Sequence, residues 1–228
     1  MTKDFNNDLM PDAIVILAGG QSRRMGSAKA LLSLPTGQRL LDYHVNAAEI
    51  FDCPILIADN DQGFFTNSQS HDGAKITQIS DYQPKGAQDQ NQGGALVAIL
   101  GAMQVLQSLP PEAWLLVISC DSLISAPMLW QKLHGKVALV NKIKQADIVC
   151  LNGHKILPLL GAYRLSLANE LQTYLDRGER RVMPFITPKV NLVDSPHYWQ
   201  ALANFNSATD FENACQAFYQ LKLLSARQ

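Results

Sequence analysis

Short apolar runs alternate along the chain with stretches in which apolar residues recur at helical spacing. The runs predict buried strands over residues 13–18, 54–58, 76–79, 114–119, 147–151, 157–163 and 190–193. Apolar residues three and four positions apart predict helices over residues 39–51, 95–109, 125–133, 165–176 and 208–224. Strands that alternate with helices favour a mostly parallel sheet whose two faces are both covered.

This order of elements predicts a single-domain, three-layer α/β/α fold of the Rossmann-like type. Neither a linker rich in Ser or Pro nor an internal repeat divides the sequence, so we expect one domain over residues 13–228. The polar residues 1–12 are expected to form a disordered tail. In such folds ligands bind outside the carboxyl ends of the strands, and chemistry is therefore expected at that edge.

Composition narrows the class of protein. A net charge of -1 provides no broad basic surface for nucleic acid or for an anionic membrane. The four cysteines are widely spaced, and the five histidines share no metal-ligand spacing, so a zinc site is disfavoured and the histidines are expected at the surface or at helix caps. With no signal peptide and no membrane-spanning run, the sequence predicts a soluble, cytoplasmic protein.

The first predicted strand leads into a glycine-rich segment, residues 17–29, that favours an anion site. Gly19 and Gly20 allow close approach of the backbone to a ligand, and consecutive amides form an anion cradle. Basic side chains, Arg24 and Lys29 among them, add positive charge with no acid nearby. A triphosphate satisfies this pattern. The alternative is an ordinary strand-to-helix turn with solvated basic residues, and the spacing is neither that of a Walker A loop nor that of a dinucleotide fingerprint.

Two carboxylates follow later strands. Asp121 comes after the strand 114–119, where a hard oxygen ligand suits Mg²⁺ bridging phosphates. The alternative for Asp121 is a solvent-facing side chain that caps a turn. Asp81 ends the third strand, where a surface turn residue is the interpretation that the residues alone support. The polar stretch after it, residues 83–94, is long enough for a functional loop.

Four strings together resemble the molybdenum cofactor guanylyltransferase (MobA-type) family of nucleotidyltransferases. They are Leu17-Ala-Gly-Gly with Arg-Met-Gly and Lys29 after it, Ser119-Cys-Asp121, Gly178-Glu-Arg-Arg-Val182, and Asn204-Phe-Asn206. The likeness extends from Ala13 to Glu212. It implies the nucleotide-diphospho-sugar transferase type of fold and transfer of GMP from GTP, with release of pyrophosphate, to the phosphate of molybdopterin. A molybdoenzyme or its chaperone would receive the resulting guanine dinucleotide.

The resemblance also implies residue roles. Catalytic roles fall on Lys29, Asp121 and Arg24, and Asp121 holds Mg²⁺. Nucleotide contacts fall on Leu17, Ala18, Gly19, Gly20, Lys29, Asp81 and Asp121. Acceptor contacts fall on Arg180, Arg181, Asn204 and Asn206. Helix-terminus and capping roles remain the alternatives for the two arginines and for Asn206.

Several positions depart from the family pattern. Ala28 replaces an Asp before the lysine, and Ala58 replaces a nucleotide-contacting Asn, although Asn60 is nearby. Ala95 and Ala98 replace a Pro and a Gly. These replacements leave open a protein that binds nucleotide or pterin without turnover. Because the choice of base rests on backbone contacts that the sequence does not expose, a second alternative is a relative that uses CTP or a different phosphorylated acceptor, such as a sugar phosphate or the cytosine form of the cofactor.

Overall fold

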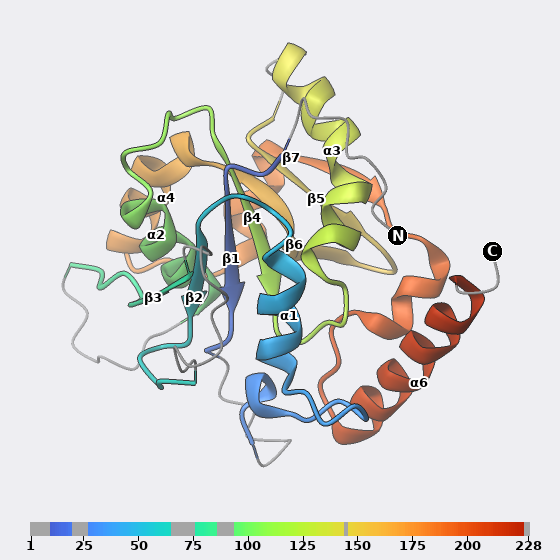
Figure 1. Ribbon diagram of the computed structural model, residues 1–228. Coiled ribbons are helices and arrows are strands. Elements are labelled where there is room, and N and C mark those ends of the chain that lie inside the picture. Colours follow the sequence, from blue (N-terminus) through green and yellow to red (C-terminus); the bar gives the residue numbers. More distant parts are fainter. Residues whose placement is uncertain (1–9, 20–26, 65–75, 86–93, 144–145, 226–228) are drawn as a thin grey trace.

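The computed structural model describes residues 10–19, 27–64, 76–85, 94–143 and 146–225. These residues form a seven-stranded sheet in the order β3-β2-β1-β4-β6-β5-β7 (Figure 1). The strands are β1 Ala13–Leu17, β2 Ile55–Ala58, β3 Ile76–Ile79, β4 Trp114–Ser119, β5 Ile148–Asn152, β6 Ile156–Arg164 and β7 Val190–Asp194. Strand β6 runs antiparallel to β4 and β5, and the other neighbouring pairs are parallel. The predicted mostly parallel sheet is therefore confirmed.

The α-helices are α1 Leu40–Ala48, α2 Ala95–Val105, α3 Ala126–Ile143, α4 Ala168–Asp176, α5 Val182–Ile186 and α6 Ala208–Ser225. Short 3₁₀ helices cover Lys29–Leu31, Leu165–Leu167, Thr187–Lys189 and His197–Leu202. Helix α3 continues past its predicted end at residue 133 because the buried side chains of Val137 and Val140 extend its apolar face. Helix α5 and the 3₁₀ segments were not predicted, since pieces this short contain too few residues to show a periodicity.

Alternating side chains of the central strands bury both faces of the sheet. Ile14 and Ile16 of β1 join the core beneath α1, α3 and α6, while Ala13 and Val15 join the core beneath α2, α4 and α5. Figure 1 shows α2 and α4 together on one side of the sheet and α1 and α3 on the other. The three-layer α/β/α fold is thus confirmed, and it leaves the ends of the strands for chemistry.

The domain includes Asp12, which the sequence assigned to the tail. Its amide donates to the carbonyl of Trp114 at 3.1 Å, and its Oδ2 accepts from the amide of Trp114 at 2.8 Å. The prediction for residues 1–9 lies outside the described residues. All four cysteines are free. Among the helices that the structure describes, none has both the length and the apolar character needed to cross a membrane.

Helix α1 supports the segment that follows β4. The hydroxyl of Tyr43 donates to the carbonyl of Leu123 at 2.9 Å, and Nε2 of His44 donates to the carbonyl of Ser122 at 2.8 Å. His44 is fully buried, so the expectation that the histidines lie at the surface or cap helices is wrong for this residue. Both contacts hold the backbone next to Asp121.

The environment of His44 favours its neutral form. Burial lowers the pKa of His44 to about 4 from its ordinary value of 6.5, and the hydrogen bond to Ser122 opposes this shift only in part. Nδ1 is buried and has no hydrogen-bond partner within the described part of the chain. A second proton on the ring would therefore place a charge and an unmatched donor in the core.

This burial predicts a pH-dependent stability. Because the unfolded state binds the proton more tightly, the free energy of unfolding should rise with pH between pH 4 and pH 6.5. Above pH 6.5 this rise should be complete. The contribution of His44 is at most about 3 kcal/mol, since one pKa unit corresponds to about 1.4 kcal/mol. His44→Gln, which keeps a donor for Ser122 but does not titrate, should flatten this part of the curve in urea unfolding from pH 4 to 8. The exposed His197→Gln serves as the control and should leave the curve unchanged, and an equal flattening in both variants would contradict the assignment.

Candidate active site at the carboxyl edge of the sheet

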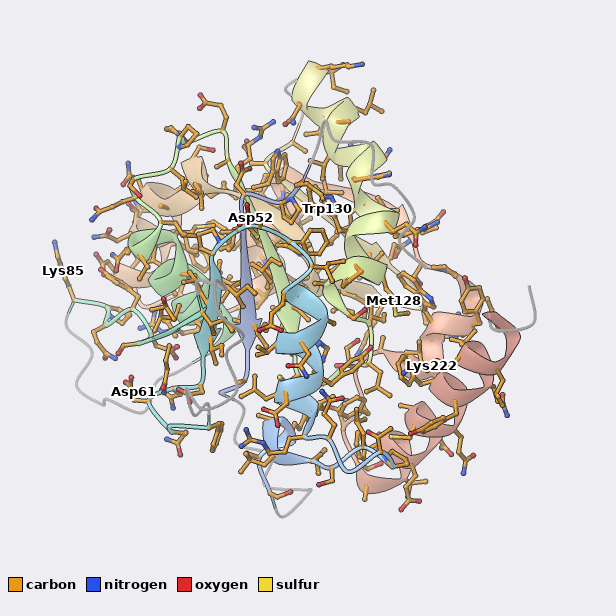
Figure 2. The ribbon with its side chains drawn as sticks, in the orientation of Figure 1. Asp52, Asp61, Lys85, Met128, Trp130 and Lys222 are labelled. Atoms are coloured by element: carbon orange, nitrogen blue, oxygen red, sulfur yellow. The ribbon has the colours of Figure 1, made fainter. Side chains whose placement is uncertain are left out.

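Four functional candidates form a row at the carboxyl edge. The strand ends Ile79, Ala58, Leu17 and Ser119 are in register across β3, β2, β1 and β4. The residues two positions beyond these ends are, in the same order, Asp81, Asn60, Gly19 and Asp121. Asp61, labelled in Figure 2, lies at this edge after β2. The parallel register therefore brings together residues that are far apart in the sequence.

Gly19 allows the turn after β1 to approach the turn after β2. A Cβ at Gly19 would lie 2.9 Å from the Cβ and the amide nitrogen of Asn60. Asn60 has a positive φ of 56°, which Asn tolerates better than most residues. Since the side chain of Ala58 belongs to the core, Asn60 is the asparagine that reaches the edge after β2.

The backbone of Leu17, Ala18 and Gly19 is used within the sheet. The amides of Ala18 and Gly19 both donate to the carbonyl of Ala58, at 2.8 and 3.1 Å, and the carbonyl of Leu17 accepts from the amide of Cys120 at 3.0 Å. These two amides consequently do not belong to an open anion cradle, contrary to the expectation. Gly20 and Arg24 lie outside the described residues, so their predicted phosphate contacts remain predictions.

Lys29 connects three remote segments. Its Nζ donates to the carbonyl of Phe205 at 2.7 Å and to Oδ1 of Asn206 at 3.2 Å, and it lies 3.7 Å from Oδ2 of Asp121. The side chains of Lys29 and Asp121 are 17% and 23% exposed, so both remain accessible to a ligand. The positive charge of Lys29 therefore has a partner within the protein, which the composition of the loop alone did not indicate.

The closing segment, residues 204–210, is held against Asp121. The amide of Phe205 donates to the carbonyl of Asp121 at 2.9 Å, and Asn204 adopts a positive φ of 57° just before it. Together with the Lys29 contacts, this pairing brings Asn206 to the site, as the resemblance implied.

A capping box fixes the end of this segment. Ser207 Oγ accepts from the amide of Asp210 at 3.1 Å, while Oδ2 of Asp210 accepts from the amides of Asn206 and Ser207. The hydrogen bond from the Asn206 amide is the main cause that lowers the pKa of Asp210. The cap of α6 is thus formed by Ser207 and Asp210, and the Asn206 side chain is left to contact Lys29.

Asp81 is the acidic member of the row with an unsatisfied oxygen. Burial raises the pKa of Asp81 to about 6, and the charges of Asp61 and Asp59 add to the shift. Its Oδ1 is buried and accepts no hydrogen bond from the residues that the structure describes. Asp59 and Asp61, in contrast, accept from Gln78 and Ser80. Asp81 is therefore a half-buried carboxylate that keeps one oxygen without a partner among the described residues.

The two arginines lie elsewhere, at the end of α4. Nη1 of Arg180 donates to the carbonyls of Leu175 and Glu179, both at 2.7 Å. This contact matches the helix-terminus alternative that the sequence left open. Arg181 is exposed, and its carbonyl accepts from the hydroxyl of Tyr174 at 2.9 Å. The contacts of both arginines thus lie within their own region, and their acceptor contacts remain predictions.

Asp121 fits one particular mode of metal binding. Within the described residues, no group of three or more His, Cys, Asp or Glu side chains is placed to hold a metal ion. Mg²⁺ in nucleotide sites is commonly bound by one or two carboxylates together with substrate phosphates. A single accessible carboxylate at the strand end suits that mode, in which the substrate supplies the other ligands.

Two departures from the family pattern, Ala28 and Ala98, lie in described segments of the structure. Ala28 precedes the 3₁₀ helix Lys29–Leu31 and offers no side-chain cap to it. Ala98 is buried in the core beneath α2. Sequence reasoning missed the roles of His44, Tyr43 and Asp210, because each acts through a neighbouring backbone group and forms no motif.

The contact at Gly19 predicts a steric cost. Gly19→Ala should destabilise the protein by about 1–3 kcal/mol, because the new methyl group meets the backbone of residues 59 and 60, which cannot rotate away. Gly135→Ala in α3, where a Cβ meets open space, is the matched control and should be neutral or stabilising by about 0.5–1 kcal/mol. Urea unfolding of both variants measures the difference. Equal stabilities would show that the two turns can separate freely.

Comparison with known proteins places this geometry in a family. The family described as MobA-like NTP transferase domain matches residues 14–190. A molybdenum cofactor guanylyltransferase of Shewanella frigidimarina (strain NCIMB 400) is 31% identical over 170 residues, which cover 74% of this chain and 76% of the relative. A probable molybdenum cofactor guanylyltransferase of Synechococcus elongatus (strain ATCC 33912 / PCC 7942 / FACHB-805) is 29% identical over 205 residues, which cover 88% of this chain and 96% of the relative.

Solved structures share the fold. Molybdopterin-guanine dinucleotide biosynthesis protein A from Archaeoglobus fulgidus aligns with a TM-score of 0.64 and 19% identity, over 91% of this chain and 99% of that one. The 2-C-methyl-D-erythritol 4-phosphate cytidylyltransferase of Francisella tularensis aligns with a TM-score of 0.61 and 12% identity, over 91% and 100% of the two chains. At these identities the structures support the fold, and the sequence matches support the family. The chain belongs to the MobA-like NTP transferase domain family.

Proposed function

We propose that this protein transfers GMP from GTP to the phosphate of molybdopterin, forming molybdopterin guanine dinucleotide and pyrophosphate. The observation that carries the proposal is the meeting of Lys29, Asp121 and Asn206 at the carboxyl edge of the sheet. Curated relatives that match most of this chain have the name molybdenum cofactor guanylyltransferase, which supports this substrate pair.

The donor nucleotide lies along the row of strand ends. Asp81 accepts a hydrogen bond from the nucleoside, and Gly19 lets the turn after β1 lie directly against Asn60 of the turn after β2. Lys29 neutralises the phosphates, and Arg24 and the amides from Gly20 onward are assigned to the same task. These roles use charge and position, which are the main contributions to phosphoryl-type transfer.

Asp121 is assigned to Mg²⁺. The bound ion would neutralise charge on the α-phosphate and on the departing pyrophosphate. Lys29 lies 3.7 Å from the same carboxylate, so its ammonium group and an ion held by Asp121 would both act on the phosphates. Together they would supply the positive charge that offsets the charge of the phosphates during the transfer.

The chemical step is an in-line displacement. A phosphate oxygen of molybdopterin forms a bond to the α-phosphorus of GTP while the bond to the β-phosphate oxygen breaks. Pyrophosphate leaves with that electron pair, and no covalent bond to the protein forms. Asn204 and Asn206 of the closing segment, with Arg180 or Arg181, are assigned to the acceptor, since amide and guanidinium groups suit phosphate and pterin oxygens.

The product is proposed to pass to a molybdoenzyme or its chaperone. The reaction is assigned to the cytoplasm, and the four free cysteines support a reducing compartment.

Measurement of pyrophosphate release tests the proposal. The protein is incubated with Mg²⁺, molybdopterin and each of GTP, CTP, ATP and UTP in turn, and release is expected with GTP alone. Release with CTP alone would instead identify a cytidylyltransferase. Saturable nucleotide binding without release would identify a binding protein.

Asp121→Asn tests the assignment of the metal. Loss of the charge should lower kcat by roughly 100-fold or more, because stabilisation of transition-state charge is lost. Asp52→Asn is the matched control: Asp52 precedes β2 at the opposite edge of the sheet (Figure 2), and its replacement should leave kcat unchanged. Unchanged turnover in Asp121→Asn would remove this carboxylate from the mechanism.

A further inference from the structure

A carboxylate outside the row of strand ends joins two remote parts of the chain. Oδ1 of Asp176, the last residue of α4, accepts from the hydroxyl of Tyr82 at 2.9 Å and from the amide of Lys85 at 3.0 Å. These partners lie 94 and 91 residues away in the sequence. Figure 2 labels Lys85, and in the same orientation Figure 1 shows α2 and α4 on that side of the molecule.

The first part that Asp176 holds is residues 80–85, here named the Asp81 loop. Helix α2 fixes its beginning: the amide of Tyr82 donates to the carbonyl of Val97 at 3.0 Å. A Cβ at Gly101 would lie only 2.5 Å from the carbonyl oxygen of Ser80, so the helix and the loop are in close contact. Asp176 fixes the end of the loop, and Asp81 directly precedes Tyr82, whose amide binds α2 and whose hydroxyl binds Asp176.

The second part is residues 178–182, here named the arginine string. It begins two residues after Asp176, and Gly178 turns the chain with a positive φ of 88°. The amide of Gly178 and Nη1 of Arg180 both donate to the carbonyl of Leu175, at 3.0 and 2.7 Å. The string is thus attached to the same helix end that binds the Asp81 loop.

The position of Asp176 in its helix needs an explanation. A carboxylate at a helix C-terminus faces the negative end of the helix dipole, which disfavours it. The donors from the Asp81 loop compensate for this placement, and together with the positive charge of Lys85 they lower the pKa of Asp176. The residue is therefore better explained by its contact with the loop than by stabilisation of α4.

We propose that Asp176 is a positioning residue that sets the spacing between the Asp81 loop and the arginine string. This inference rests on the proposed function, in which Asp81 contacts the nucleotide and the string contacts the acceptor. Nucleotide and acceptor must meet in line, and small displacements of positioning groups cost large factors in rate. Asp176 transmits its effect through these two segments and touches neither substrate.

Asp176→Ala tests the inference. We expect kcat for pyrophosphate release to fall roughly 10- to 100-fold while the KM for GTP changes by less than about 3-fold, because alignment is lost and nucleotide binding is kept. Hydrogen exchange should become faster in residues 80–85 and 178–182. Tyr82→Phe should have a smaller effect of the same kind. The double variant should be no worse than Asp176→Ala alone, because Asp176→Ala already removes the hydrogen bond that Tyr82→Phe removes.

Two further variants separate positioning from general stability. Asp176→Asn keeps a neutral acceptor at this position and should retain most of kcat. It tests the role even if Asp176→Ala folds poorly. Asp147→Ala removes a carboxylate that pairs with Arg164 at 3.5 Å before β5, and it should leave kcat and exchange in both segments unchanged.

The outcomes are distinguishable. If the wild-type protein releases pyrophosphate and Asp176→Ala keeps its kcat, or lowers kcat no more than Asp147→Ala does, the positioning role alone is overturned. A rate loss without faster exchange in the two segments also overturns it. Wild-type protein that releases no pyrophosphate with any nucleotide refutes the proposed function, and the positioning role with it.

Discussion

The ammonium group of Lys29 joins three segments of the chain at one site. It contacts the carbonyl of Phe205 and the amide oxygen of Asn206, and it lies beside the carboxylate of Asp121. A charged group that is largely buried is costly unless polar partners surround it. The closing segment supplies two of these partners, and Asp121, in the turn after β4, supplies the negative charge. Lys29, the turn after β4 and the closing segment therefore meet at one side chain, and the hydrogen bond from Phe205 to Asp121 also joins the last two.

Much of the fold followed from the apolar pattern, because strands buried on both faces are nearly continuous apolar runs. The row of Asp81, Asn60, Gly19 and Asp121 also followed in outline, since parallel strands place their carboxyl ends at one edge. What the pattern did not contain was the register that aligns these four positions. Register depends on hydrogen bonds between strands far apart in sequence, and no local signal reports it.

The residues that were missed share a physical reason. His44 looks like a solvent-facing polar residue within a helix, yet it donates to a backbone carbonyl in the core. The contact of Lys29 with Phe205 involves a main-chain oxygen, which every residue possesses, so no motif distinguishes it. Arg180 illustrates the opposite case: its string resembles the family, while its contacts are those of an ordinary helix end. The resemblance to the family pointed to the segment that contains Arg180 and implied a contact with the acceptor. The structure shows that Arg180 contacts the end of its own helix.

The contact between Lys29 and Asn206 spans 177 positions, which has a consequence for the order of folding. The cost in chain entropy of closing so long a loop must be met before the contact contributes to stability. The family match ends at residue 190, before the closing segment, although the strands that carry Gly19 and Asp121 lie within it. During synthesis the strands that precede Gly19 and Asp121 are therefore made before Phe205 and Asn206, the hydrogen-bond acceptors of Lys29. The site becomes complete only when the closing segment docks against Lys29 and Asp121, which precede it in the chain.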